Sequence, residues 1–427
     1  MRVCLRRFRN CIIIVLVVCC CFNNKAAAQD STNTALKPIP EKDMSDVFRY
    51  IFKKKPDTGA AKKDGFAVLP SFGYNPSFGF VIGAKAATGI QYGDHRNTNY
   101  STIGLEALYT SKGIITAQAI HNIFTAGNQL NWQGNWQLSR FGIVDYGLGS
   151  GAGKNRGGGF VWNEFPVDRA DSMFPIKYTY IRINQKLYKK IAKNLYAGGG
   201  VSLNFYTNIN DEKQTGIFST PHQRYSKRNN FNPEKYNANG LIAALQYNTL
   251  EHPARAYGGM YADVNFRFNQ TWIGSTKNAV QFQYDIRKFW SLSSVNPTHV
   301  LAVWHWASYK LSGSLPYLEL PSTGSDTYKR SGRGYTIGRF KGPSFAYFET
   351  EYRFPITKNK LISGVCFFNL QSASTDTGEK IFSALDKGGG AGLRILFKKQ
   401  SRNTLCIDFS KGQYGSSGIF FGLNEVF

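Results

Sequence analysis

The chain has 427 residues, a formal net charge of +25 and 15% aromatic residues. Only two of its cysteines, Cys366 and Cys406, lie beyond residue 28, which excludes a disulfide framework. No apolar run after residue 28 approaches the roughly 20 residues that a membrane helix needs, so helical membrane spans are excluded as well. A basic surface of this kind either binds anions or is simply solvated.

The first 28 residues have the pattern of a signal peptide. A positive segment is followed by the short apolar run 11–22 and by the small residues Ala26, Ala27 and Ala28 before Gln29. Val18, rather than a small residue, precedes Cys19, which argues against a lipoprotein. Export disfavours nucleic acid as a partner. It favours outer-membrane lipids and the phosphates of lipopolysaccharide as partners of the basic charge.

Residues 29–63 are polar and basic, and we expect a short periplasmic segment and linker there. The stretch 45–55 predicts one amphipathic helix, and the residues after it have the composition of a linker. The segment is too short to form a domain of ordinary size.

From residue 64 onward the apolar residues recur with a period of two. In QLNWQGNWQL (129–138), Leu130, Trp132 and Trp136 share one face and amide side chains fill the other. The stretches 257–268 and 278–287 repeat the pattern. A face rich in amides and pairable charges suits the wet lumen of a transmembrane barrel better than the exterior of a soluble sandwich.

The same pattern predicts sixteen strands. They are 64–73, 78–92, 99–110, 113–124, 128–139, 174–187, 194–208, 238–250, 257–269, 278–289, 297–310, 344–354, 360–372, 387–397, 402–411 and 417–427. All four long connections (140–173, 209–237, 311–343 and 373–386) follow odd-numbered strands, as external loops of an outer-membrane barrel do. We therefore expect an all-β, 16-stranded antiparallel transmembrane β-barrel over residues 64–427 with long external loops.

The loop after the eleventh strand carries a recognisable set of motifs. They are Pro316–Leu320, the tip Arg333-Gly334-Tyr335, Gly338–Gly342 and Glu351–Pro355. This region resembles the sixth-loop region of the BamA/TamA outer-membrane assembly superfamily, also called the bacterial surface antigen barrels.

The resemblance continues to the end of the sequence, with departures. Gly390–Arg394, Leu405–Phe409 and the pair Gly422 and Phe427 look like the family's last strands and its C-terminal assembly signal. Asn369 and Gln371 stand where the family has Asp and Gly, and Glu425 stands where its signal has an aromatic residue. The family's periplasmic POTRA domains do not fit into residues 29–63, so the resemblance is to a short member that lacks them.

The resemblance implies that the sixth loop folds into the lumen and that Arg333 contacts the inner wall. On the strand pattern Glu351 faces inward, so we expect Arg333 to bind Glu351 and Asn369 to accept a further hydrogen bond. Because the family's Asp is absent, we expect a weaker latch. Gly334 and Tyr335 complete the loop tip, and the supporting lumen residues are Arg339, Glu349, Arg353, Arg394 and Asp408. The alternatives are an Arg333 on a solvated loop, or a latch with a purely structural role.

Two further expectations concern single side chains. Cys366 falls on the lipid face and Cys406 on the lumen face, so no disulfide is expected between them. The basic segments 222–230 and 328–330 are expected on external loops, where they either bind lipopolysaccharide or are solvated.

Three functions remain open at this point. The first is a barrel that assists insertion or export of protein or lipid at the outer membrane, working through the seam between its first and last strands. The second is a plugged structural barrel without transport, and the third is a passive pore for small solutes. No loop offers a nucleophile, a base and an orienting group together, so we expect no enzyme, no cofactor and no metal. Expected partners are the barrel assembly machinery during the protein's own insertion and a separate periplasmic protein.

Overall fold

A computed structural model describes residues 40–52, 67–75, 79–94, 97–151, 160–162, 165–167, 173–216, 219–399, 402–423 and 425–427. The expected signal peptide (1–28) lies outside these residues, as does most of the expected periplasmic segment. The chain divides into residues 1–40 and 41–427, and every element below belongs to the second unit.

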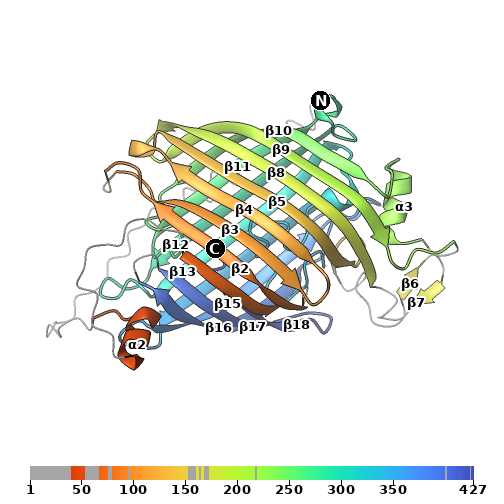
Figure 1. The fold of residues 1–427 in the computed structure, drawn as a ribbon. Coiled ribbons are helices and arrows are strands. Elements are labelled where there is room, and N and C mark those ends of the chain that lie inside the picture. The colour runs from red at the N-terminus through yellow and green to blue at the C-terminus, as the bar shows by residue number, and fades with distance from the viewer. Residues whose placement is uncertain are drawn as a thin grey trace. The chain divides into compact units, whose positions relative to one another are not determined.

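The second unit is built on one antiparallel sheet of sixteen strands that pair in chain order (Figure 1). The strands are β1 (Ala67–Asn75), β2 (Gly79–Ile90), β3 (Ser101–Thr110), β4 (Ile115–Phe124), β5 (Leu130–Asp145), β8 (Phe174–Ala192), β9 (Leu195–Asp211), β10 (Tyr236–Asn248), β11 (Gly259–Asn269), β12 (Ala279–Ser291), β13 (Val300–Gly313), β14 (Ser344–Pro355), β15 (Ile362–Ala373), β16 (Asp386–Lys398), β17 (Asn403–Gly412) and β18 (Ser417–Leu423). The period-two pattern located each of them to within a few residues, apart from the ends of β5, β8 and β18.

The four long connections of the sheet lie at one of its ends. The long ones follow β5, β9, β13 and β15, and antiparallel order brings them to the same end. They contain structure that the sequence pattern did not predict. The first holds the hairpin of β6 (Phe160–Trp162) and β7 (Phe165–Val167), and the second holds helix α3 (Pro221–Arg228). We call the other end of the sheet, with the short connections, its turn end.

The two faces of the sheet differ as the sequence pattern required. On β5 the side chains of Asn131, Asn135 and Gln137 are buried, at 0, 5 and 3% exposed, whereas Trp132 and Trp136 are 45 and 48% exposed. The polar side chains therefore line the inner face, and the apolar ones form the outer face. This is the reverse of a soluble sandwich, which buries its apolar face.

The inner face is covered by the connection between β13 and β14, residues 314–343, which we call the inner loop. Its apolar side chains are buried, with Leu315, Tyr317 and Phe340 at 0% exposure. The 3-10 turn η3 (Tyr317–Glu319) lies in the first part of the inner loop. Near the end of the loop, Lys341 forms a β-bridge with Gly149 of the first long connection. The inner loop thus replaces solvent along much of the inner face.

The first and last strands lie beside each other without pairing. β1 and β18 are in contact, but no ladder of hydrogen bonds joins them within the described part of the chain. β18 is short, because its pairing with β17 ends at Leu423 opposite Leu405. The expected strand 417–427 is therefore too long, because β18 ends at Leu423 and residues 425–427 do not belong to it.

A helix precedes the sheet in the described part of the chain. Helix α2 (Met44–Ile51) begins one residue before the predicted stretch 45–55 and ends within it. It begins with a capping box, in which the Asp43 carboxylate accepts from the Asp46 amide at 3.0 Å and the Asp46 carboxylate accepts from the Asp43 amide at 3.1 Å. Among the described residues no helix has the length and apolar character to cross a bilayer.

Candidate functional site

The site begins with a tight turn at the tip of the inner loop. Gly332 and Gly334 flank Arg333 with φ values of 89° and 98°, a left-handed region that favours glycine. A side chain at Gly334 would meet the backbone of Lys411 and Gly412 at 3.1 to 3.2 Å. The Gly-Arg-Gly sequence therefore lets the backbone lie against β17 while the arginine side chain extends along the inner face.

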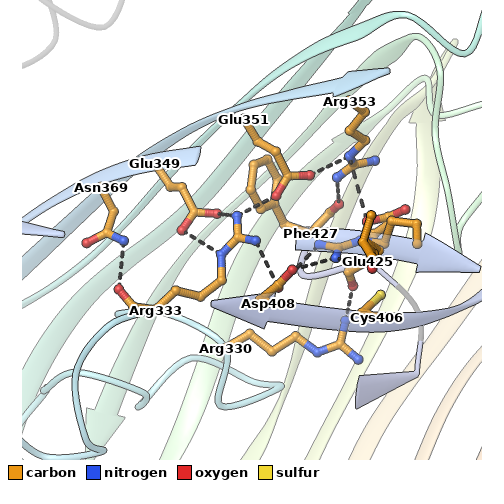
Figure 2. Close-up of polar contacts among 12 residues, drawn as sticks. Arg330, Arg333, Glu349, Glu351, Arg353, Asn369, Cys406, Asp408, Glu425 and Phe427 are labelled. Atoms are coloured by element: carbon orange, nitrogen blue, oxygen red, sulfur yellow. Dashed lines mark hydrogen bonds and ion pairs between the residues drawn. The ribbon is translucent and has the colours of Figure 1, made fainter. Parts of the chain in front are cut away.

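Arg333 is surrounded by three carboxylates (Figure 2). Its Nε donates to Glu349 at 3.2 Å and its Nη1 donates to Asp408 at 3.2 Å, while its Nη2 contacts both Glu349 and Glu351. The guanidinium also stacks on the Phe367 ring, with 3.5 Å between its central carbon and the ring centroid. A planar group with five donors suits this arrangement, and a lysine would not reproduce it. The predicted contact with Glu351 is present, together with two acidic partners that the sequence pattern did not assign.

These contacts continue into a closed cycle of alternating charges, which we call the charge ring. Arg353 binds Glu351 at 2.5 Å and lies 3.9 Å from Glu425, and Arg394 binds Glu425 at 2.7 Å. Arg394 and Arg333 both bind Asp408, which closes the cycle. In order, the charge ring is Arg333, Glu351, Arg353, Glu425, Arg394 and Asp408.

Two more charged groups attach to the charge ring. Glu349 binds Arg333, and Arg255 in the turn after β10 lies 3.1 Å from Glu425. The total is then four guanidinium groups and four carboxylates, so the cluster is neutral although its side chains are at most 4% exposed. Neutrality matters because a buried charge without a partner costs several kcal/mol.

Asn369 has a different role from the expected one. Its side-chain amide donates to the backbone carbonyl of Arg333 at 2.9 Å rather than accepting from the guanidinium. Its register partner on β14 is Glu349, so an Asp here would place two carboxylates directly opposite each other. The expectation that Asn weakens the latch is not supported by this geometry, because Asp408 supplies an acidic partner and Asn369 secures the backbone.

Tyr335, the third residue of the tip, fits between two strands. Its hydroxyl donates to the Lys387 carbonyl and accepts from the Gln413 amide at 2.8 Å. A side chain at Gly412 would meet the ring at 2.5 Å, and one at Gly388 would meet it at 3.2 Å. Two strand glycines therefore make the space that the tyrosine occupies.

The segment after β18 turns to the inner face, which corrects the expected position of the C-terminal signal. Glu425 and Phe427 are 2 and 8% exposed, and the Phe427 ring packs on Trp304 with centroids 5.3 Å apart. Arg353 donates to the Phe427 carbonyl at 2.8 Å, and Arg330 donates to the Glu425 carbonyl. Glu425 lies on the inner face because its carboxylate is attracted by buried arginines. Gly422 remains on β18.

The remaining predicted residues lie as follows. Arg339 is 7% exposed and stacks on Tyr146 at 4.2 Å. Cys366 is exposed on the outer face and Cys406 is buried on the inner face, and no disulfide joins them. The segment 328–330 is not an external basic segment, because it belongs to the inner loop and Arg330 reaches the segment after β18.

The first part of the inner loop is held by a second cluster, which no local sequence pattern indicated. We call it the tyrosine cluster; it comprises Tyr178, Tyr180, Tyr206, Tyr225, Tyr236 and Tyr317. Tyr225 donates to the Leu315 carbonyl at 2.8 Å, and Tyr317 donates to Asp145 at 2.8 Å. Beside the cluster, Lys341 binds Asp145 at 3.1 Å. The tyrosines come from β8, β9, α3, β10 and η3, so only the folded chain brings them together.

Comparisons with known proteins agree with this geometry. The family described as the Omp85 superfamily domain matches residues 83–398. The chain belongs to the Omp85 superfamily. The resemblance drawn from the loop motifs is therefore confirmed at the level of the superfamily. A search of curated proteins finds no match.

Solved structures of this superfamily share the fold. BamA from Haemophilus ducreyi lacking POTRA domains 1–3 matches with a TM-score of 0.53 and 12% identity, over 85% of this chain and 70% of that one. CdiB from Acinetobacter baumannii matches with 0.51 and 11%, over 86% and 60%. CdiB from Escherichia coli matches with 0.53 and 9%, over 86% and 63%. The chain thus spans less than two thirds of each CdiB, and these likenesses concern the fold. BamA and CdiB are outer-membrane proteins of Gram-negative bacteria.

Proposed function

We propose that this protein is a sixteen-stranded outer-membrane barrel of the Omp85 superfamily that assists the insertion or export of protein or lipid through the seam between β1 and β18. In this proposal the two strands close the barrel, the long connections are external, and the signal peptide directs export. The protein acts by rearranging contacts and carries no catalytic chemistry. Its partners are outer-membrane lipids and lipopolysaccharide, the machinery that inserts it, and a separate periplasmic protein.

The proposal rests on the missing pairing between β1 and β18 at the seam. β1 and β18 are neighbours without a ladder, so the seam is the one boundary in the described sheet where adjacent strands lack pairing. The segment that would extend β18 is instead held on the inner face by Arg353 and Arg394. Unpaired strand edges are templates for pairing with another chain. A seam of this kind can therefore accept a client strand or open towards lipid.

A disulfide across the seam tests the proposal. In a background with Cys366→Ser and Cys406→Ala, cysteine pairs are introduced in β1 and β18 and the pair that oxidises most completely is chosen. The control pair is Val201→Cys with Leu241→Cys, which lie opposite each other in β9 and β10. Both variants replace the native protein in a depletion strain. The readout is the amount of outer-membrane protein and lipopolysaccharide with and without reductant.

We expect the locked seam to reduce these amounts several-fold and reductant to restore them, while the control pair has no effect. Equal amounts with the seam locked and unlocked would contradict a seam mechanism. That outcome would favour the second candidate, a plugged structural barrel, which the burial of the inner loop supports. A passive pore is tested by conductance in planar bilayers. We expect small, flickering currents that rise when residues 314–343 are removed, because this loop fills the inner face.

A further inference from the structure

Helix α2 carries an apolar stripe whose C-terminal part is left exposed by the described part of the chain. Met44, Val47, Phe48, Ile51 and the helix-ending Phe52 follow the spacing i, i+3, i+4, i+7 and i+8. Phe48, Ile51 and Phe52 are 49, 62 and 66% exposed. Three large apolar side chains on a two-turn helix are costly to leave in water. The stripe therefore calls for an apolar partner.

The opposite side of the helix is fixed to the turn end of the sheet. Lys399 at the end of β16 binds the Asp46 carboxylate at 2.8 Å, and its backbone amide donates to Asp43 at 2.9 Å. The amide of Lys42 donates to the Asn359 carbonyl in the turn between β14 and β15. The hydrogen bond from Lys399 lowers the pKa of Asp46 below its ordinary value of 3.8. This part of the docking is present above that pH and is lost as the pH falls through the lower folded value.

The anchor and the stripe lie on opposite sides of the helix. In an α-helix, residues advance about 100° each, so Asp46 lies nearly opposite the middle of the stripe. The anchor holds the helix beside β16 at the level of the turns, where the outer face of the sheet ends. Apolar side chains on that outer face, including Leu393 of β16, are also exposed.

We propose that α2 is an interfacial helix that buries the stripe of Phe48, Ile51 and Phe52 in the lipid surface at the turn end of the sheet. This proposal rests on the outer-membrane location given under the proposed function. Charge selects the lipid: Arg49 lies on the helix, and Lys53, Lys54 and Lys55 follow it in the sequence. An aromatic and aliphatic stripe with adjoining basic residues suits a surface with anionic headgroups. The alternative occupant, a periplasmic protein, is an outcome of the test below.

Site-specific quenching tests the proposal. The chain without the expected signal peptide (1–28), which holds the other five cysteines, is folded into vesicles of phosphatidylethanolamine with or without phosphatidylglycerol. An environment-sensitive fluorophore is then placed on a single cysteine. Three single-cysteine proteins are compared. Ile51→Cys reports the stripe, Tyr50→Cys reports the flank of the helix, and native Cys366 reports the outer face of β15. The first two carry Cys366→Ser, and all three carry Cys406→Ala. Quenching is measured with lipids that bear a nitroxide near the headgroup or deep in the acyl chain.

We expect the Ile51 label to be quenched at least twice as strongly by the shallow nitroxide as the Tyr50 label, and only with phosphatidylglycerol present. High salt should weaken this difference. Quenching at Cys366 with none at Ile51 would overturn the proposal and leave the membrane location intact; the stripe would then be a protein-binding face. No quenching at Cys366 would instead contradict the membrane location itself. A matched variant, Asp46→Asn, removes the charge of the anchor. In this variant we expect quenching of the Ile51 label to differ less between the shallow and the deep nitroxide.

Discussion

The inner loop is held at two places by opposite kinds of chemistry. Its first part packs into the tyrosine cluster. There, neutral hydroxyls donate separate hydrogen bonds to carbonyls and carboxylates, and the aromatic rings pack against one another. The tip of the inner loop enters the charge ring, where each charged group is bound to two or more others. The tyrosine cluster should lose stability in small, nearly additive steps, whereas the charge ring should respond as a unit. Four substitutions test this difference.

The largest effect is expected for Arg333→Ala. It leaves Glu349, Glu351 and Asp408 buried without their shared cation, and breaking a buried ion pair from one side costs about 3–5 kcal/mol. The temperature at which unheated samples lose their folded mobility in gel electrophoresis should fall accordingly. Cleavage of the inner loop by protease should rise. Arg333→Lys should recover only part of the loss, because it cannot reach three carboxylates at once.

The next effect is expected for Glu425→Gln, which keeps the shape but removes the charge that Arg394 and Arg255 share. We expect a loss of about 1.5–3 kcal/mol, measured in the same gel assay. The double variant with Arg333→Ala decides whether the charge ring acts as a unit. If the two losses simply add, the ring is a set of independent pairs.

Asn369→Asp restores the residue usual in the family, yet we expect it to destabilise this protein. The change removes the donor to the Arg333 carbonyl and places a carboxylate opposite Glu349. A loss of about 1–2 kcal/mol follows from these two terms. Increased resistance of the inner loop to protease would show that the family's Asp strengthens the latch here as well.

The smallest effect is expected in the tyrosine cluster. Tyr225→Phe keeps the ring packing and removes one hydrogen bond, to the Leu315 carbonyl, so about 0.5–1 kcal/mol should be lost. Pairing it with Tyr180→Phe should give close to the sum of the single losses. A strongly non-additive result would mean that the tyrosine cluster is as cooperative as the charge ring.

Much of the fold could be predicted because the two faces of a strand appear in its own sequence as alternating apolar and polar residues. The alternation in β5 located the strand and its wet face without any knowledge of its neighbours. The loop tip was found through its Arg-Gly-Tyr motif. Glu349 and Asp408 were placed on the inner face, although their shared partner was not identified.

The rest depends on distance in space rather than on local pattern. The strand pattern placed Asn369 on the inner face. Whether its side-chain amide donates or accepts a hydrogen bond depends on the Arg333 backbone, which comes from another segment of the chain. Glu425 was visible as a departure from the family's signal. Its attraction to Arg394 and Arg255 required the folded sheet. The tyrosine cluster is built from five elements, and none of these elements carries a sequence pattern that predicts it.

The charge ring also has a consequence for the order of folding. Its contacts join residues far apart in the chain: Arg333 meets Asp408, and Arg255 meets Glu425. Closing such long loops is slow, because the entropy is lost before the contact forms. We therefore expect the tip of the inner loop to stay unsecured until residues 425–427 have entered. A protein synthesised only as far as β17 would leave this tip open to proteases, so the entry of residues 425–427 acts as a check that the sheet is complete.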